Sequence, residues 1–141
     1  MWARRFCSLQ LEGSLKHGIA LVPHFKVAGN ACVPGTATPP PEYVVLDFAS
    51  YADKRLFEGN AALEIYCDDR LALKGNAQLI PTAESGIEES IGQYLSARVS
   101  FKLLKRMATA KQVRIVLGSK QFQLLADDVA ALARMTAYGT P

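Results

Sequence analysis

The most regular hydrophobic pattern in the chain lies at 112–124, where apolar and polar residues alternate. A period of two predicts a pair of β-strands. Gly118 and Ser119 stand between them, and glycine at the first central position supplies the positive φ of a type II′ turn. Ile115 then faces Phe122, and the large apolar residues of both strands share one face. These residues are Val113, Ile115, Leu117, Phe122 and Leu124.

A helical period replaces this alternation at 101–110. With about 100° between successive residues, the apolar side chains share one arc and the basic side chains the other. Ser100 is the expected N-cap of this helix. The apolar arc consists of Phe101, Leu103, Leu104, Met107 and Ala108.

A second helix is predicted at 128–138, capped by Asp127 and followed by Gly139. Asp128 adds negative charge to its first turn, where the helix dipole favours it. Apolar residues cover most of its circumference, which is typical of a helix that is deeply buried or that docks on a partner. The residues that would form such an interface, with a protein partner or a second copy, are Val129, Leu132 and Met135.

Further strands are expected earlier in the chain. Asp68-Asp69 predicts the tight turn of a second hairpin, and Lys74-Gly75-Asn76 predicts another turn. The strands are expected at 42–48, 62–67, 70–73, 78–81 and 94–99.

Together these elements predict an α+β fold. We expect an antiparallel sheet of about five to seven strands, with the helices at 101–110 and 128–138 packed on one side. Arg114, Gln121 and Gln123 point to the other face of the sheet, which is therefore expected to be wet.

The first 41 residues differ in composition, so we expect a basic irregular tail with a proline-rich linker at 1–41 and a single domain at 42–141. Arg4 and Arg5 are typical of the start of an export signal, here cleaved before Cys32, although the apolar run that follows is short. That interpretation favours a location outside the cytoplasm. The alternatives are a disordered tail and a start codon assigned ahead of the true domain.

Length and hydropathy limit the class of protein. With 141 residues, half of them hydrophobic, the chain suits one domain with a real core. Its apolar runs fall short of the roughly 20 residues that span a bilayer, so no transmembrane helix is predicted.

Charge is segregated along the chain. Residues 42–89 hold ten acids and four bases, whereas 90–126 hold seven bases and no acid. One interpretation is a face that binds an anionic partner, either nucleic acid or acidic lipid. The other is a solvated helix face and strand ends attracted to the acidic half of the same fold. Aromatic residues do not alternate with these cations, which disfavours nucleic acid. The candidate residues are Lys102, Lys105, Arg106, Lys111, Arg114 and Lys120.

No metal or cofactor site is predicted. The three cysteines include no C-x-x-C pair. Two cysteines and two histidines are residue types that bind zinc, but their spacing here matches no compact zinc pattern. These residues are Cys7, His17, His24 and Cys32.

Catalysis is not expected either. Residues 42–141 contain no histidine, the commonest general acid or base near neutral pH. The chain has no P-loop, dinucleotide fingerprint or nucleophile elbow. A carboxylate-dependent hydrolase would require Asp47, Asp53 and Asp68 to converge in one pocket.

Residues 43–138 resemble a set of small uncharacterised bacterial proteins, in the stretches V-V-L-D-F-A-S-Y-A-D-K-R-L-F and L-K-R-M-A-T-A-K-Q-V-R-I-V-L-G-S-K-Q-F-Q-L. Those proteins often carry an export signal ahead of a similar domain. The resemblance therefore implies an exported location, and it supplies no activity, cofactor or site residue.

The leading functional hypothesis is a small non-catalytic binding or interaction domain. The alternative hypothesis is a binder of an anionic partner through the basic stretch 98–120.

Overall fold

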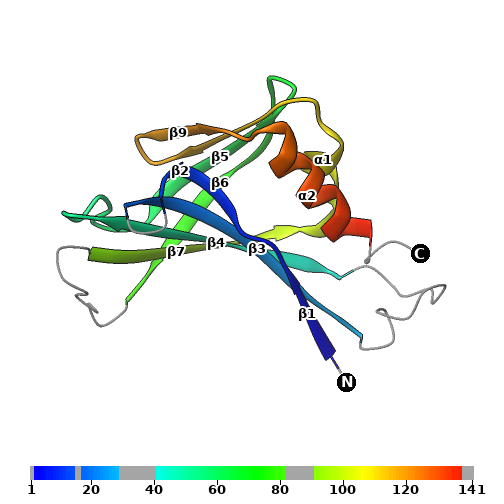
Figure 1. Ribbon diagram of the computed structural model, residues 1–141, viewed down its shortest axis with the longest axis horizontal. Helices are drawn as coiled ribbons and strands as arrows, with labels where there is room; N and C mark the ends of the chain where they lie inside the picture. The colour runs from blue at the N-terminus through cyan, green and yellow to red at the C-terminus, as the bar shows by residue number, and fades with distance from the viewer. Residues whose placement is uncertain (1, 15–16, 29–40, 82–90, 138–141) are drawn as a thin grey trace.

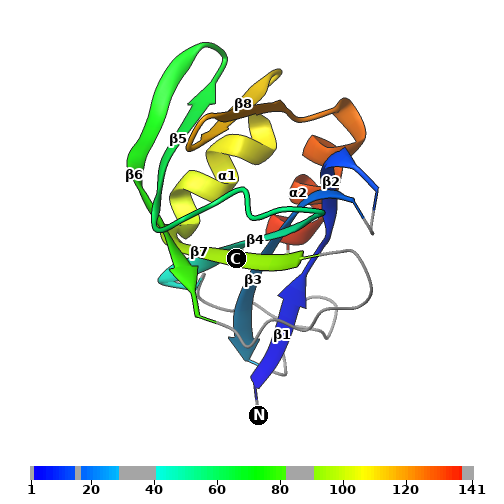
Figure 2. The same ribbon diagram turned by 90° about the vertical axis from the view of Figure 1, so that its left-hand side faces the viewer.

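The computed structural model describes residues 2–14, 17–28, 41–81 and 91–137. Within these residues nine strands form one curled antiparallel sheet, and two helices pack inside its curve (Figures 1 and 2). The strands are β1 (Trp2–Phe6), β2 (Leu9–Gly13), β3 (Gly18–Ala28), β4 (Tyr43–Ala52), β5 (Ala61–Cys67), β6 (Arg70–Ile80), β7 (Ile91–Ser100), β8 (Val113–Leu117) and β9 (Lys120–Gln123). The helices are α1 (Phe101–Thr109) and α2 (Ala126–Thr136). Neither of these helices is long and apolar enough to cross a membrane.

The strands follow the order β1-β3-β4-β7-β6-β5-β8-β9 across the sheet. β2 pairs with β3 on the same side as β1, so β1 and β2 act as one interrupted strand. The interruption at Cys7 and Ser8 lies opposite Val22 and Pro23. Proline has no backbone N–H to donate, so a break in the neighbouring strand suits this position.

The N-terminal segment is part of the sheet, and the expectation of an irregular tail over 1–41 is wrong for the residues that form β1, β2 and β3. β3 pairs with β4 from Gly18 to His24. Its side chains alternate in burial, and Ile19, Leu21 and Phe25 belong to the core. The cleavage site expected before Cys32 and most of the proline-rich linker lie outside the described residues.

The α+β class is confirmed in outline, but the sheet has nine strands rather than five to seven. Three of the nine come from the N-terminal segment, and the strands expected at 70–73 and 78–81 are one strand, β6. The turn expected at Lys74-Gly75-Asn76 is absent, because β6 continues through it with Gly75 paired to Leu63 and Lys74 paired to Glu64. The backbone partner on β5 therefore overrides the local turn signal.

The hairpin and the first helix match their predictions. Leu117 faces Lys120 and Gly118 has a φ of +60°, while Ser119 has no positive φ, as a type II′ turn requires. The Ser100 hydroxyl accepts a hydrogen bond from the Leu103 N–H at 3.1 Å and caps α1.

The second helix begins two residues earlier than predicted, and Asp127 is not its N-cap. Leu125 occupies the cap position, and the Asp128 carboxylate accepts a hydrogen bond from the Leu125 N–H at 3.0 Å. The predicted C′ residue, Gly139, lies outside the described residues.

Both helices lie on the concave side of the sheet, where they cover the hydrophobic core (Figures 1 and 2). Leu104 of α1 and Leu132 of α2 are fully buried. The convex side is wetter, as predicted: Gln121 and Gln123 are exposed and Arg114 is half-buried. Side chains fill the interior of the curl, and those buried most completely include Phe48, Leu63, Ile65, Leu95 and Ile115.

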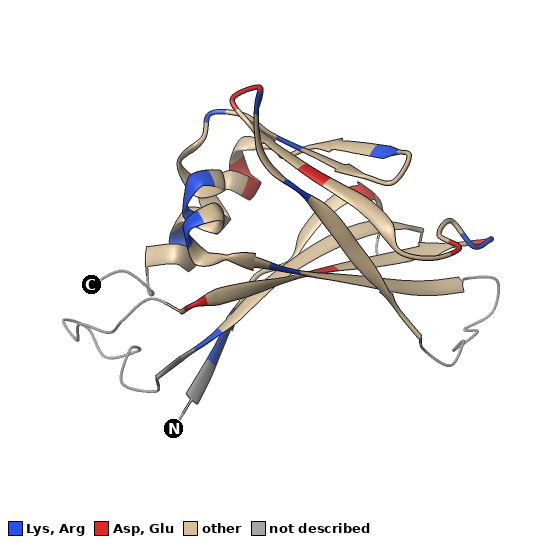
Figure 3. Cartoon of the chain, turned by 180° about the vertical axis from the view of Figure 1, so that it is seen from behind, with Lys and Arg blue, Asp and Glu red and all other residues tan. Residues whose placement is uncertain are grey.

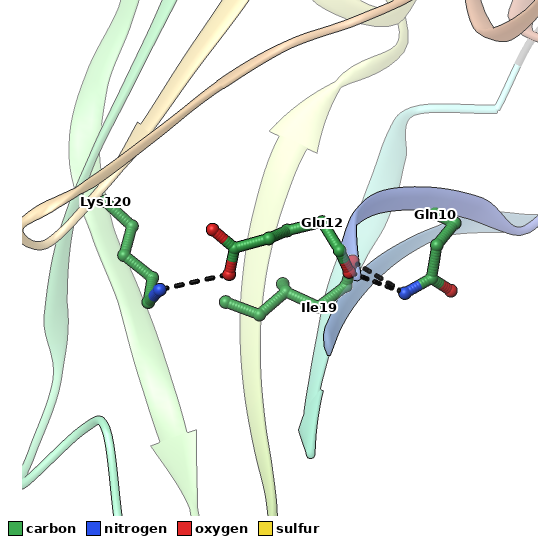
Figure 4. Close-up of polar contacts among 4 residues, drawn as sticks. All are labelled: Gln10, Glu12, Ile19 and Lys120. Carbon is green, nitrogen blue, oxygen red and sulfur yellow. Dashed lines mark hydrogen bonds and ion pairs between the residues drawn. The ribbon is translucent and has the colours of Figure 1, made fainter. Parts of the chain in front are cut away.

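The two outer edges of the curled sheet meet through one ion pair. The Lys120 ammonium of β9 lies 3.0 Å from a Glu12 carboxylate oxygen of β2 (Figure 4). Gln10 holds this part of β2 in place, since its side-chain N–H donates to the Glu12 carbonyl at 2.8 Å and to the Ile19 carbonyl at 3.4 Å. The sheet therefore approaches a closed barrel without a hydrogen-bonded seam.

Candidate functional site

Because the interior is packed with side chains, a binding site has to be sought on the surface. The feature that stands out is β6, which is paired along one side only for most of its length. It pairs with β5 from Arg70 to Ala77, but with β7 only from Gln78 to Ile80. On the N-terminal side of Gln78, β6 diverges from β7. The helix α1 follows directly from β7 and forms the third side of a triangle with these two strands (Figures 1 and 3).

The hydrogen bonds around β6 show which of its backbone groups face the open side. In a strand, the N–H and C=O of one residue point to the same side, and successive residues point to opposite sides. The Leu79 N–H donates to the Asn60 side chain at 2.9 Å, on the β5 side, so odd-numbered residues of β6 from Leu73 to Leu79 face β5. A register shift opposite Ile65 and Tyr66 ends this alternation at Ala72. On β5, the Ala62 carbonyl accepts a hydrogen bond from the Gly118 N–H, so the backbone groups of Ala62 face β8. Those of the next residue, Leu63, therefore face β6.

Between Leu73 and Ile80, even-numbered residues of β6 therefore face away from β5. Among them, Gln78 and Ile80 meet β7. The N–H and C=O groups of Lys74 and Asn76 have no hydrogen-bond partner within the described residues. We call these groups the β6 edge. Unpaired backbone groups in a row are a template for another strand.

The side chains around the β6 edge are suited to contact with a partner. Leu71 is 49% exposed, and Lys74 is exposed on the convex face opposite Glu64. Glu64 accepts a hydrogen bond from the Tyr66 hydroxyl at 2.5 Å, and this bond is the largest cause of a raised pKa for Tyr66. The Arg114 guanidinium carbon lies 4.1 Å from the centre of the Tyr66 ring. The convex surface beside the edge is therefore polar, with one exposed leucine.

The structure separates the six cations that the sequence suggested as one anion-binding set. Three of them, Lys102, Lys105 and Arg106, share the exposed face of α1. Lys111 follows that helix, and its backbone N–H donates to the Asp68 carboxylate at 2.9 Å. The remaining two, Arg114 and Lys120, lie on opposite faces of the β8–β9 hairpin.

This separation follows from the strand register. Arg114 stacks on Tyr66 on the convex face. Lys120 is paired with Leu117, which points inward, and its ammonium is engaged by Glu12. The basic surface is therefore that of α1, and it borders the triangle that the β6 edge opens (Figure 3).

The suggested interface residues on α2 face inward. Leu132 is fully buried, Met135 is 6% exposed, and Val129 is half-buried against the core. α2 packs on α1, so these side chains contact the protein's own core. On the outward side of α2 lie Ala133 and Arg134, both exposed.

The acidic candidates for catalysis do not converge. Asp47 lies on the convex face of β4, where one carboxylate oxygen is 2.6 Å from Nε2 of His24. Asp68 is in the β5–β6 turn with a φ of 51° and accepts hydrogen bonds from the N–H groups that follow α1. Asp53 lies just beyond the end of β4 and borders a surface hollow that is lined by neither Asp47 nor Asp68.

The sequence analysis missed the His24–Asp47 pair because it assigned His24 to a tail. Alternation of Ile19, Leu21 and Phe25 was the available signal for a strand there. Within the described residues no group of three or more histidine, cysteine or acidic side chains is arranged to hold a metal ion.

The chain was compared with known proteins in three ways. No protein-family model, no curated protein and no solved structure matches the chain.

Proposed function

We propose that this protein is a small non-catalytic interaction domain that binds an extended segment of a partner protein along the β6 edge. The observation that supports this proposal is the pair of residues with unpaired backbone groups, Lys74 and Asn76, near the exposed side chain of Leu71. In binding by strand addition, main-chain hydrogen bonds supply affinity and alternate side chains supply specificity.

Charge favours an acidic partner segment. An acidic side chain opposite Lys74 would be attracted to its ammonium group, and the cations of α1 across the triangle extend the attraction.

A selection from short linear peptides displayed on phage, with the full chain as target, tests this proposal. We expect enriched peptides in which acidic residues alternate with apolar ones, because one face of the added strand meets Lys74 and the other meets the core side of the sheet. In an NMR spectrum of the complex, peptide amides should show contacts to Lys74 and Asn76.

Proline variants separate the edge from the rest of the fold. Lys74→Pro removes an N–H that faces the open edge and leaves the ladder with β5 intact, so it should fold and bind at least about tenfold more weakly. Asn76→Pro is a second variant of the same kind. Leu73→Pro removes an N–H that faces β5 and should unfold the domain.

A charge variant at the same position distinguishes the backbone from the ammonium group. Lys74→Gln keeps the N–H and should weaken binding of acidic peptides only at low salt. The proposal fails if Lys74→Pro and Asn76→Pro, both folded, bind the selected peptides as tightly as the unmodified chain. Binding of nucleic acid or acidic lipid vesicles that is lost in Lys105→Glu, with no peptide enriched, would favour the anionic-partner hypothesis instead.

A further inference from the structure

A separate hollow of about 310 Å³ lies where β1 meets the last turns of α2. Its lining comes from two parts of the chain that are far apart in sequence. A contact at 3.7 Å between the Cys7 thiol and the Met135 sulfur helps to hold α2 against the end of β1. The side chains that matter for its chemistry are Arg4, Arg5, Phe6, Cys7, Arg134 and Met135.

The charge of this hollow is positive. Arg4 lines it from β1 and Arg134 lines it from α2, and no acidic residue is among the described residues that line it. Asp128 acts on the electrostatics of Cys7, and its carboxylate accepts a hydrogen bond from the Leu125 N–H. Guanidinium groups from two elements around one space are suited to a carboxylate or phosphate, which they bind through paired hydrogen bonds.

The other part of the lining is apolar. Phe6 is 63% exposed, and the Arg4 guanidinium carbon lies 5.6 Å from the centre of its ring. Met135 is buried and Cys7 is half-buried. The hollow therefore offers cationic groups beside an aromatic ring and two sulfur atoms.

The thiol in this hollow is not a nucleophile at neutral pH. Burial is the largest cause that raises the pKa of Cys7, Asp128 raises it further, and Arg134 lowers it. A protonated thiol contributes contact rather than covalent chemistry. The arrangement is therefore one for reversible binding.

We propose that this hollow binds a small organic anion, a carboxylate or phosphate carried on an apolar or aromatic body. Its volume stands at the lower end of the range for small-molecule sites, so a compact ligand fits it better than a polymer. The oxyanion meets Arg4 and Arg134, and the apolar body lies against Phe6 and Met135. This site is independent of the β6 edge and does not rest on the function proposed for it.

Four probes test the proposal by NMR titration of the labelled full chain. Benzoate and phenyl phosphate carry both an anion and an aromatic body, benzyl alcohol lacks the charge, and inorganic phosphate lacks the body. We expect both aryl anions to shift the amide signals of Phe6, Cys7 and Met135, and to bind more tightly than either control. Tighter binding of phenyl phosphate assigns a phosphate ligand, and tighter binding of benzoate assigns a carboxylate.

Neutral variants of the arginines localise the site. Arg134→Gln should weaken aryl-anion binding about tenfold or more, because a charge-assisted hydrogen bond is lost. Lys105→Gln, on the exposed face of α1, should leave it unchanged. Arg4→Gln provides the same test from β1 if the first variant does not fold.

Three results would overturn the proposal. One is that benzyl alcohol binds as tightly as benzoate, which would show that charge plays no part. Another is that inorganic phosphate binds as tightly as phenyl phosphate, which would show only an adventitious ion. The third is that Lys105→Gln weakens binding as much as Arg134→Gln does.

Discussion

The side-chain amide of Gln93 forms two hydrogen bonds with the backbone of Phe57. Its oxygen accepts from the Phe57 N–H at 3.1 Å, and its nitrogen donates to the Phe57 carbonyl at 2.6 Å. The same oxygen accepts from the Leu56 N–H at 2.9 Å. Phe57 and Gln93 are both buried, so this amide holds the β4–β5 connection against the core.

Replacing this amide should destabilise the fold strongly. Gln93→Leu leaves buried backbone groups of Leu56 and Phe57 without partners, at about 1–3 kcal/mol for each group. We expect a loss of about 2–5 kcal/mol in the free energy of unfolding, measured by urea denaturation. Gln121→Leu, at an exposed position on β9, is the matched control and should change stability by less than about 0.5 kcal/mol. Equal values for the two variants would contradict the role of Gln93.

The Glu12–Lys120 ion pair should contribute modestly and should depend on salt. The Lys120 and Glu12 side chains are 29% and 50% exposed, and pairs of this kind are worth about 0.2–1 kcal/mol. A double-mutant cycle of Glu12→Gln and Lys120→Met should give a coupling energy in that range at low ionic strength. At 1 M salt, where the screening length is about 3 Å, the coupling should vanish. A coupling that persists there would mean that the pair is held by packing.

Removal of the N-terminal strands should prevent folding. A chain beginning at residue 29 lacks Leu9, Ile19, Leu21 and Phe25, which are buried in the core. Each such side chain contributes about 1.5–3 kcal/mol, and their sum is comparable to the whole stability of a domain, about 5–15 kcal/mol. Circular dichroism and size-exclusion chromatography should show an unfolded or aggregated chain.

Fragment complementation is the control for this deletion. A synthetic peptide of residues 1–28 added to the truncated chain should restore native spectra, because β3 can pair again with β4. A truncated chain that folds alone would show that the N-terminal strands are dispensable.

Stability at alkaline pH should depend on a tyrosine pair. The hydroxyls of Tyr51 and Tyr94 are 2.6 Å apart, and this hydrogen bond, followed by burial, raises the pKa of Tyr51 to about 12. An unfolded tyrosine ionises near pH 10, so the folded state holds this proton more tightly. The stabilisation is complete below about pH 10 and is lost as the pH rises toward 12.

Tyr94→Phe removes the hydrogen bond and should flatten this decline. The measurement is the urea midpoint at a series of pH values from about 9 to 12, for the unmodified chain and the variant. Identical slopes would mean that the Tyr94 hydrogen bond does not raise the pKa of Tyr51.

The parts of the fold that the sequence predicts correctly are those that depend on neighbours in the chain. The β8–β9 turn needs only a glycine at 118 with a positive φ, and α1 needs only its apolar arc and the Ser100 cap. Asp68 and Asp69 both adopt positive φ in the turn that their composition predicts.

The parts that were missed depend on distant partners. Pro23, His24 and Lys26 interrupt the apolar signal of β3, yet the strand forms because β4 offers a full backbone ladder to it. Gly75 has the composition of a turn, but its N–H and C=O face β5. Local preference cannot report a partner that is supplied by the rest of the fold.

The candidate site was beyond the reach of sequence for a related reason. The β6 edge exists because β6 pairs with β7 only from Gln78 onward and lies apart from it before that residue, and this divergence is a property of the curled sheet. The basic residues of α1 were visible in the sequence, but their separation from Arg114 and Lys120 follows from strand register alone.

The ion pair between Glu12 and Lys120 joins residues 108 positions apart, and this separation bears on how the protein is made. During synthesis β2 leaves the ribosome long before β9 exists, so the outer edge of the N-terminal strands has no opposite edge to approach until most of the chain has been translated. Contacts of such long sequence separation are formed slowly. The nascent chain therefore spends most of its synthesis with an open sheet edge, a feature that makes incompletely folded chains prone to aggregation.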